Sequence, residues 1–253
     1  MTYAVSTRTL QPYVVRSVNR ISSFDPVSQY ATEATQVTEI AADQATGRAL
    51  SGKSRTESLS TGTFEDGTPH GLTTIRSVAE ETLQGLEKAN ALAMVSRTTM
   101  ATTLNSVDHL MNERHEQLTQ RVNAVGKILG AQAVTRTVTR NELSDYLDSV
   151  NLSETDYQVI SGNQIVPTRT RSLEVTANAI DGSYRMVARE DATRYDHFGR
   201  IREIKEDNPS ESGYELLFYK DLTVFPTPEK RDRVSPEALF EQVFGESFGA
   251  PSG

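Results

Sequence analysis

The sequence predicts an elongated α+β protein in which one long helix precedes a small antiparallel sheet. A heptad-spaced stripe runs between Ser77 and Leu129, which is typical of a coiled-coil helix. Apolar and polar residues alternate between Tyr157 and Phe225, which is typical of strands. Only 36% of the 253 residues are hydrophobic and none is Trp, so a single dense core is not expected. We therefore expect an extended chain that neighbouring copies or partners stabilise.

Residues 1–24 form the first predicted region, an extended basic arm. Arg8, Arg16 and Arg20 lie there without any acidic residue. Such an arm on an acidic protein is typical of a docking peptide that adds a strand to a partner's sheet. A merely solvated terminus is the alternative.

Residues 25–72 are predicted to hold one helix and a connector. Asp25-Pro26 has the pattern of an N-cap and a first helical residue, and apolar steps of three and four extend the helix to about Ala45. The stretch from Thr46 to Leu72 is rich in Gly, Ser and Thr, which predicts an irregular connector.

Residues 73–131 are predicted to form the long coiled-coil helix. A capping box at Ser77 and Glu80 begins it, and Gly126 and Gly130 end it. At 1.5 Å per residue it would span roughly 80 Å. The residues proposed for an oligomer seam are Leu83, Leu86, Asn90, Ala93, Met100, Leu104, Val107, Met111, Leu118 and Val125.

This seam contains polar residues, among them Asn90, Arg97 and Arg114. Polar seam residues cost stability but can fix the register and the number of strands. Three interpretations follow: self-association, packing against other chains, or an ordinary helix within one chain. We expect a homo-oligomer, with a trimer or hexamer favoured by the resemblance given below.

Residues 132–228 are predicted to form the small antiparallel β domain. A capping box at Thr139 and Glu142 opens a short helix through about Val150. The best hairpin signal is Asp181-Gly182 between alternating runs. The predicted strands lie within Tyr157–Val166, which contains a turn at Ser161-Gly162-Asn163, and at Leu173–Ala177, Tyr184–Ala188, Ile201–Ile204 and Tyr214–Phe225.

Residues 229–253 are predicted to be a linker and an amphipathic C-terminal helix. Ser235 caps the helix, Pro236 is its first residue and Gly245 ends it. Its apolar face carries Leu239, Phe240, Val243 and Phe244. This face either docks into a partner's groove or packs back on its own sheet.

One motif suggests nucleotide chemistry. Gly47, Gly52, Lys53 and Ser54 match the fixed positions of the phosphate-binding loop. That loop needs a buried strand before it and a helix after it, and the flanking residues predict neither. We interpret the match as chance and expect no cofactor, although a nucleotide-binding protein stays a minor alternative.

Candidate metal and catalytic residues are sparse. His109 and Glu113 have the helical spacing of two ligands, but a third ligand is missing. Asp196-His197 has no nucleophile in a recognisable motif beside it. We expect no metal site and no enzymatic activity.

The net charge of −8 argues against non-specific binding to nucleic acid or to an anionic membrane. Cysteine is absent, which suits synthesis in a cytoplasm. The N-terminus lacks the apolar run of a signal peptide, and no stretch is long and apolar enough to span a membrane.

The predicted order of a rod at Ser77–Leu129 and a β region at Tyr157–Phe225 resembles that of virion proteins of tailed bacteriophages, of the fibre, neck and tail-accessory type. The resemblance is architectural and has no signature motif. It implies a structural protein of a virion whose termini anchor it to other structural proteins of the particle, with the virion as its location. An intracellular coiled-coil adaptor or scaffold is the alternative.

Overall fold

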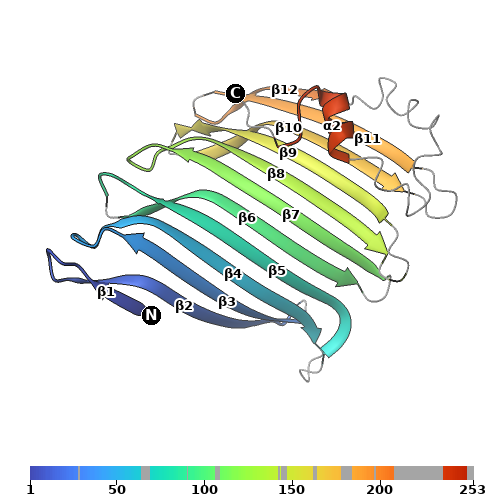
Figure 1. Cartoon of the computed structure of the whole chain (residues 1–253). Coiled ribbons are helices and arrows are strands. Elements are labelled where there is room, and N and C mark those ends of the chain that lie inside the picture. Colours follow the sequence, from blue (N-terminus) through green and yellow to red (C-terminus); the bar gives the residue numbers. More distant parts are fainter. Residues whose placement is uncertain are drawn as a thin grey trace. The chain divides into compact units, whose positions relative to one another are not determined.

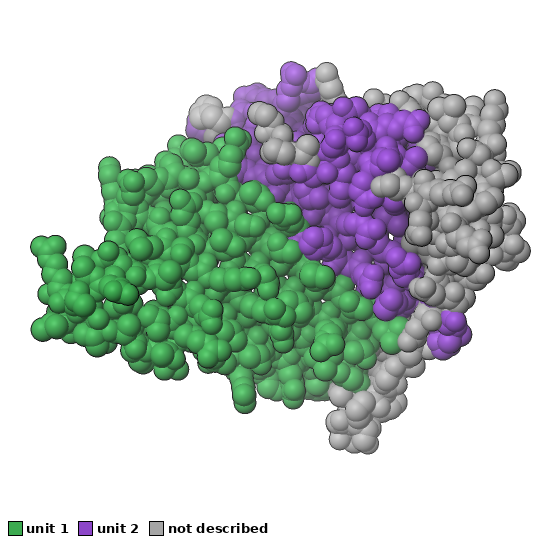
Figure 2. All heavy atoms as spheres, viewed as in Figure 1, with its two compact units in different colours: residues 1–108, 117–129 green, residues 109–116, 130–253 purple. Residues whose placement is uncertain are grey.

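A computed structural model describes residues 1–27, 29–63, 69–89, 91–105, 109–141, 143, 147–161, 164–177, 184–196, 198–207 and 236–249. Within these ranges the chain forms twelve antiparallel strands and one α-helix (Figure 1). The chain divides into two compact units (Figure 2). Unit 1 is Met1–Asp108 and Gln117–Leu129, and unit 2 is His109–Glu116 and Gly130–Gly253.

The predicted long helix is wrong, and with it the α+β coiled-coil class. Its region holds β5 (Pro69–Gly85), β6 (Leu92–Asn105), β7 (Leu110–Val122) and the start of β8 (Ile128–Asn141). The physical reason is visible in β6, where Thr98, Thr99, Thr102 and Thr103 favour a strand, because their branched side chains lose rotamer freedom in a helix.

Unit 1 is a sheet whose strands are paired in chain order. The sheet starts with β1 (Thr2–Val5), β2 (Pro12–Asp25), β3 (Tyr30–Ala42) and β4 (Ala49–Thr63), and continues through β5 and β6. The predicted helix at Pro26–Ala45 is therefore wrong, and so is the irregular connector. The basic arm consists of two strands of the chain's own sheet.

The turn between β3 and β4 shows how the hairpins of unit 1 are fixed. The Asp43 carboxylate accepts hydrogen bonds from the backbone N–H and the hydroxyl of Thr46, both at 2.8 Å. Gly47 has a φ of 72°, and a Cβ at this position would lie 2.9 Å from the Tyr13 ring. Glycine is needed there, since it adopts this backbone conformation without cost and leaves room for the ring.

In unit 2 the predicted strands at Leu173–Ala177, Tyr184–Ala188 and Ile201–Ile204 are confirmed as parts of longer strands, and the stretch Tyr157–Val166 contains the end of one strand and the start of the next. These strands are β9 (Leu147–Ile160), β10 (Gln164–Ala177), β11 (Tyr184–Tyr195) and β12 (Ile201–Asp207), paired antiparallel in that order after β8. The predicted short helix through Val150 is wrong, because β9 begins at Leu147. The Asp181-Gly182 turn and the predicted strand at Tyr214–Phe225 lie outside the described residues.

The C-terminal helix is confirmed as α2 (Pro236–Phe244). Gly245 ends it with a φ of 70°, and its N–H donates to the carbonyl of Glu241 at 2.8 Å. Helices commonly end on a glycine in this conformation.

The core of the described chain lies in unit 2, between α2 and one face of the sheet. Its members are Val138, Val150, Leu152, Leu173, Val175, Met186, Ala188, Leu239 and Phe240. In the described part of unit 1 only Leu86, Ser6 and Ser54 have buried side chains. Unit 1 is therefore held mainly by backbone ladders and cross-strand side-chain pairs.

Candidate functional site

The predicted seam residues do not form one stripe. Leu83 lies in β5, Ala93, Met100 and Leu104 in β6, and Met111 and Leu118 in β7, whereas Leu86 and Val125 lie in turns. Asn90 and Val107 are outside the described residues. In a strand, a step of three residues changes the face and a step of four does not, so a heptad pattern is divided between both faces of the sheet.

The residues of the phosphate-loop match lie in a turn and a strand. Gly47 is in the turn before β4, and Gly52, Lys53 and Ser54 are within β4. The Lys53 ammonium pairs with Glu80 at 3.0 Å, and Ser54 is buried on the opposite face. Because β4 is paired with β3 and β5 through this stretch, its backbone cannot wrap around a phosphate.

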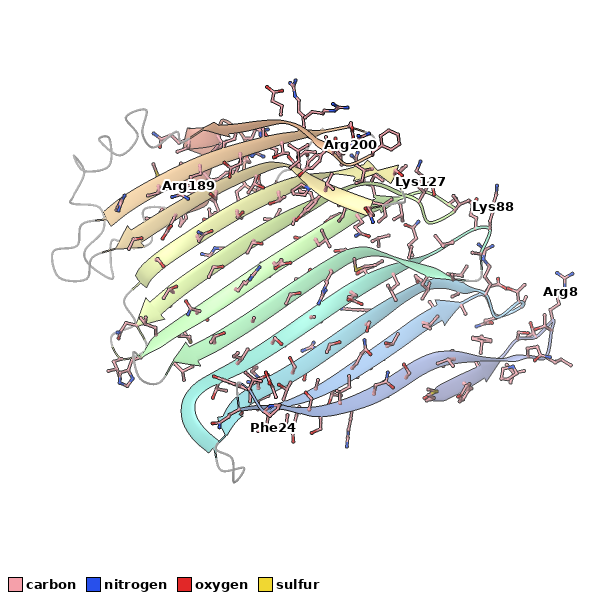
Figure 3. All side chains as sticks on the ribbon, turned by 180° about the vertical axis from the view of Figure 1, so that it is seen from behind. Arg8, Phe24, Lys88, Lys127, Arg189 and Arg200 are labelled. Carbon is pink, nitrogen blue, oxygen red and sulfur yellow. The ribbon has the colours of Figure 1, made fainter. Side chains whose placement is uncertain are left out.

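The three arginines of the predicted docking arm are split between a turn and β2. Arg8 lies in the turn between β1 and β2, where its backbone N–H donates to the Ala45 carbonyl at 2.9 Å and its side chain projects away from the sheet (Figure 3). Arg16 and Arg20 lie in β2, and Arg16 is 3.4 Å from Glu39.

One face of strands β2–β6 in unit 1 gathers most of the charged side chains of those strands. The strand register places these residues on a common side. We call it the charged face. It consists of Arg16, Val18, Arg20, Ser22 and Phe24 from β2, Ala31, Glu33, Thr35, Val37 and Glu39 from β3, Lys53, Arg55, Glu57, Leu59 and Thr61 from β4, Thr74, Arg76, Val78, Glu80 and Thr82 from β5, and Ser96, Thr98, Met100, Thr102 and Leu104 from β6.

Ion pairs cross the middle of the charged face. Arg55 lies 2.7 Å from Glu57 and 3.3 Å from Glu80, which also binds Lys53. The hydrogen bond from Lys53, followed by its charge and that of Arg55, holds the pKa of Glu80 below its usual value. These acidic and basic groups largely neutralise one another, so this face has no dominant sign of charge.

Two grooves lie on the charged face beside these ion pairs. One has a volume of about 780 Å³ and includes Glu33, Leu59 and Arg76 in its lining. The other, of about 400 Å³, is lined in part by Arg76 and Met100. Arg76 has no acidic partner within the described ranges, and Met100 is 59% exposed. A partner could therefore engage an unpaired guanidinium and a flexible apolar side chain here.

The opposite face of unit 1 is built mainly from small hydroxyl side chains. Thr32 and Ser60 are hydrogen-bonded at 2.7 Å, and Thr38 and Ser54 at 3.1 Å. Ser58 and Ser77 are also hydrogen-bonded across β4 and β5. Since these hydroxyls bond one another, this hydroxyl face offers fewer open groups than the charged face.

In unit 2 a buried ionic network lies beneath α2. Arg171 Nη2 donates to Glu154 Oε2 at 2.7 Å, and both side chains are almost wholly buried. Arg171 Nη1 makes a short but poorly aligned contact of 2.9 Å with Glu246 Oε2. Burial raises the pKa of Glu154, whereas the N–H of Gly249 and the charge of Arg171 oppose that rise.

The apolar face of α2 rests on this network and on the core. The Arg171 guanidinium carbon lies 5.6 Å from the centre of the Phe240 ring and 6.0 Å from that of Phe244, within cation–π range. Leu239 and Phe240 are buried, and Val243 and Phe244 pack against the same core. Of the two alternatives for the predicted docking helix, the structure shows packing on the chain's own sheet.

The histidine candidates lie in different settings from those expected. His109 is in a turn with a φ of 53°, and Glu113 lies in β7 rather than on a helix. Within the described ranges, no three His, Asp or Glu residues gather closely enough to hold a metal ion. In the same part of the chain, no helix has the length and apolarity needed to cross a membrane.

No protein-family model and no curated protein match this chain.

The charged face was not predicted as a surface, since Lys53 and Met100 were assigned to other roles and Arg55 and Arg76 were missed, although a signal exists. Lys53, Arg55, Glu57 and Leu59 alternate with Ser54, Thr56, Ser58 and Ser60. This period of two is typical of a strand with two different faces, and its high Ser content led to the connector prediction instead.

Proposed function

We propose that this chain is a non-catalytic assembly protein and that the charged face of unit 1 is its contact surface for another protein. The observation that carries the proposal is the open pair of grooves beside the neutralised ion pairs, where Arg76 and Met100 are exposed. Arg and Met are enriched in protein–protein interfaces, where they combine apolar contact with directional hydrogen bonds.

The composition of the charged face favours a protein partner over other ligand classes. Nucleic acid requires a stripe of basic residues, whereas Glu33, Glu57 and Glu80 interrupt the basic residues here. Small molecules favour enclosed apolar pockets, whereas these grooves extend over the side chains of several strands. An extended and electrically mixed surface suits another folded protein.

The proposed partners are other proteins of a larger particle or further copies of this chain. A virion is the particle to search first, although the rod on which that resemblance rests is replaced by strands. An adaptor with a transient partner would use the same charged face. A stable and stoichiometric place in a particle distinguishes assembly from adaptor function.

The test is whether a charge-reversal variant, expressed in the organism that encodes the chain, is still incorporated into particles. We expect Arg76→Glu to lower the amount of the chain in purified particles at least about tenfold, because the loss of a hydrogen-bonded charged group at an interface weakens binding by about that much or more. Quantitative mass spectrometry of the particles measures this. Lys88→Glu is the matched control, because it makes the same change of charge at a residue that lies in a turn away from the charged face (Figure 3). Equal incorporation of both variants contradicts the proposal.

A further inference from the structure

The outer edge of β2 is open over more than half of its length. β1 pairs only with the first part of β2, from Pro12 to Arg16, and ends there with Thr2 opposite Arg16. From Ser17 to Phe24, no strand among the described residues pairs with the outer side of β2. Figure 1 shows β2 continuing beyond β1 at this edge of unit 1. A row of backbone donors and acceptors is thus available to another strand.

This open edge has little of the usual protection against strand pairing. Proteins commonly protect such edges with charged side chains, especially Lys, with Pro or with a bulge, and Ser17 to Phe24 contains neither Lys nor Pro and one charged residue, Arg20. Its large apolar side chains are instead exposed, at 44% for Val18, 56% for Ile21 and 53% for Phe24. Phe24 lies near the end of β2, away from the turn that holds Arg8 (Figure 3).

We propose that the open edge binds the same edge of a second copy, as an antiparallel pair with a two-fold axis at Ile21. The ends of the segment define this register. β1 covers the edge up to Arg16, and β2 ends at Asp25, whose carboxylate accepts the Val27 N–H at 2.9 Å in the following turn. When Ile21 faces Ile21 of the second copy, an antiparallel pair covers all of Ser17 to Asp25, the part of β2 beyond Arg16.

The side chains favour the same register independently. With Ile21 facing itself, Val18 of each copy lies opposite Phe24 of the other, and Arg20 lies opposite Ser22. Aromatic and β-branched residues are favourable cross-strand pairs. A register centred on Arg20 would instead place two like charges directly opposite each other, which is destabilising.

The faces of the two sheets also match in this arrangement. Val18 and Phe24 both belong to the charged face, and Ile21 belongs to the hydroxyl face. An antiparallel pair about a two-fold axis continues each face of one copy into the same face of the other. The dimer contact along the edge of β2 differs from the contact proposed for the charged face, so this inference does not rest on the proposed function.

The first test is the oligomeric state of the full chain by sedimentation over a range of concentrations. We expect a reversible dimer, and we expect Ile21→Lys to raise its dissociation constant at least about tenfold, because it removes apolar contacts and places like charges together. Leu50→Lys, at a residue 54% exposed near the start of β4 and outside the charged face, is the matched control and should leave dimerisation unchanged. A wild-type chain that stays monomeric up to its solubility limit overturns the proposal.

A second test addresses the register by disulfide formation. The chain has no cysteine, so each introduced thiol is unique. Ile21→Cys should form a disulfide-linked dimer on oxidation, because facing Cα atoms in an antiparallel pair are about 4.5–5.5 Å apart. Ser23→Cys should not do so alone, since the two copies of that residue would lie roughly 13 Å apart along the strands. Equal cross-linking of both variants, or none from Ile21→Cys, overturns the register.

Discussion

Arg171 in β10 carries a positive charge that is buried between the sheet and α2. Glu154 neutralises it from β9, and Glu246 approaches it from the segment after α2. Removing one member of a buried ion pair leaves the other charge desolvated and unpaired. The network therefore ties the position of α2 to that of two strands.

We predict that Arg171→Ala lowers the free energy of unfolding by about 3–5 kcal/mol, the usual cost of leaving one buried charge unpaired. Urea unfolding followed by circular dichroism measures the change. Arg194→Ala removes a side chain that is 76% exposed and paired with Glu203, and should change the stability by less than about 1 kcal/mol. Similar effects of both substitutions would contradict this role of Arg171.

The second prediction concerns pH and Glu246. Its short contact with Arg171, and then the charge of that guanidinium, lower the pKa of Glu246 below the ordinary 4.5. A lowered carboxyl pKa adds stability above the ordinary value, and this stability is lost as the pH falls through the lowered pKa. Unfolding of wild type and Glu246→Gln at several pH values should therefore show a gap at pH 7 that closes in acid. A gap that widens in acid would refute this assignment.

At the level of the element, the close approach of β5 to β4 depends on Gly85. A Cβ at this position would lie 2.6 Å from the carbonyl oxygens of both Ala49 and Leu50. These are backbone atoms of a paired strand and cannot move aside as a flexible side chain can.

We predict that Gly85→Ala destabilises the chain by roughly 1–3 kcal/mol, the range expected for forcing a group into a well-packed site. Thermal unfolding provides the measurement. Gly52→Ala is the comparison, since the nearest backbone atom to its Cβ is the Glu39 carbonyl oxygen at 3.1 Å, so a smaller loss is expected. If Gly52→Ala were the more damaging of the two, the close approach at Gly85 would not be the controlling contact.

The elements that could be predicted from the sequence are those with one clear periodicity. In β10, Leu173 and Val175 are buried and alternate with more polar residues, and α2 has both a proline start and a glycine end. In β5 neither face is mainly apolar, because Arg76 and Glu80 lie on one side and Glu81 on the other. Without a buried face the alternation is weak, and irregularly spaced apolar residues matched a heptad instead.

The candidate site could not be predicted for a related reason. The charged face depends on which strands are neighbours, and Arg55, Arg76 and Met100 come from three different strands. The predicted connector and long helix would not bring these three residues together. Only the local alternation from Lys53 to Ser60 was available in advance.

At the scale of the whole molecule, the two units differ in how they are stabilised. The described core belongs to unit 2, whereas the side chains of unit 1 are mostly at least partly exposed. Backbone amides exchange with solvent more slowly where buried contacts must be broken first. The two units are therefore expected to differ in local stability.

We predict that hydrogen exchange monitored by mass spectrometry is slowest in the central parts of β9 and β10, around Leu152 and Leu173, and fast along β2 from Ser17 to Phe24. Both core residues are fully buried, whereas the side chains at this end of β2 are mostly exposed. The comparison should use dilute protein, in which the proposed dimer dissociates. Slower exchange in β2 than in β10 under that condition would contradict this ranking.

The pairing of strands in chain order has a mechanical consequence for unit 1. From β1 to β6, each strand forms its backbone ladders with the strands before and after it in the sequence. A pulling force applied to the N-terminus across the strands would load one ladder at a time, because no described ladder in β1–β6 links strands that are distant in sequence. Unit 1 would then lengthen in successive steps, each releasing one strand while the next ladder still holds.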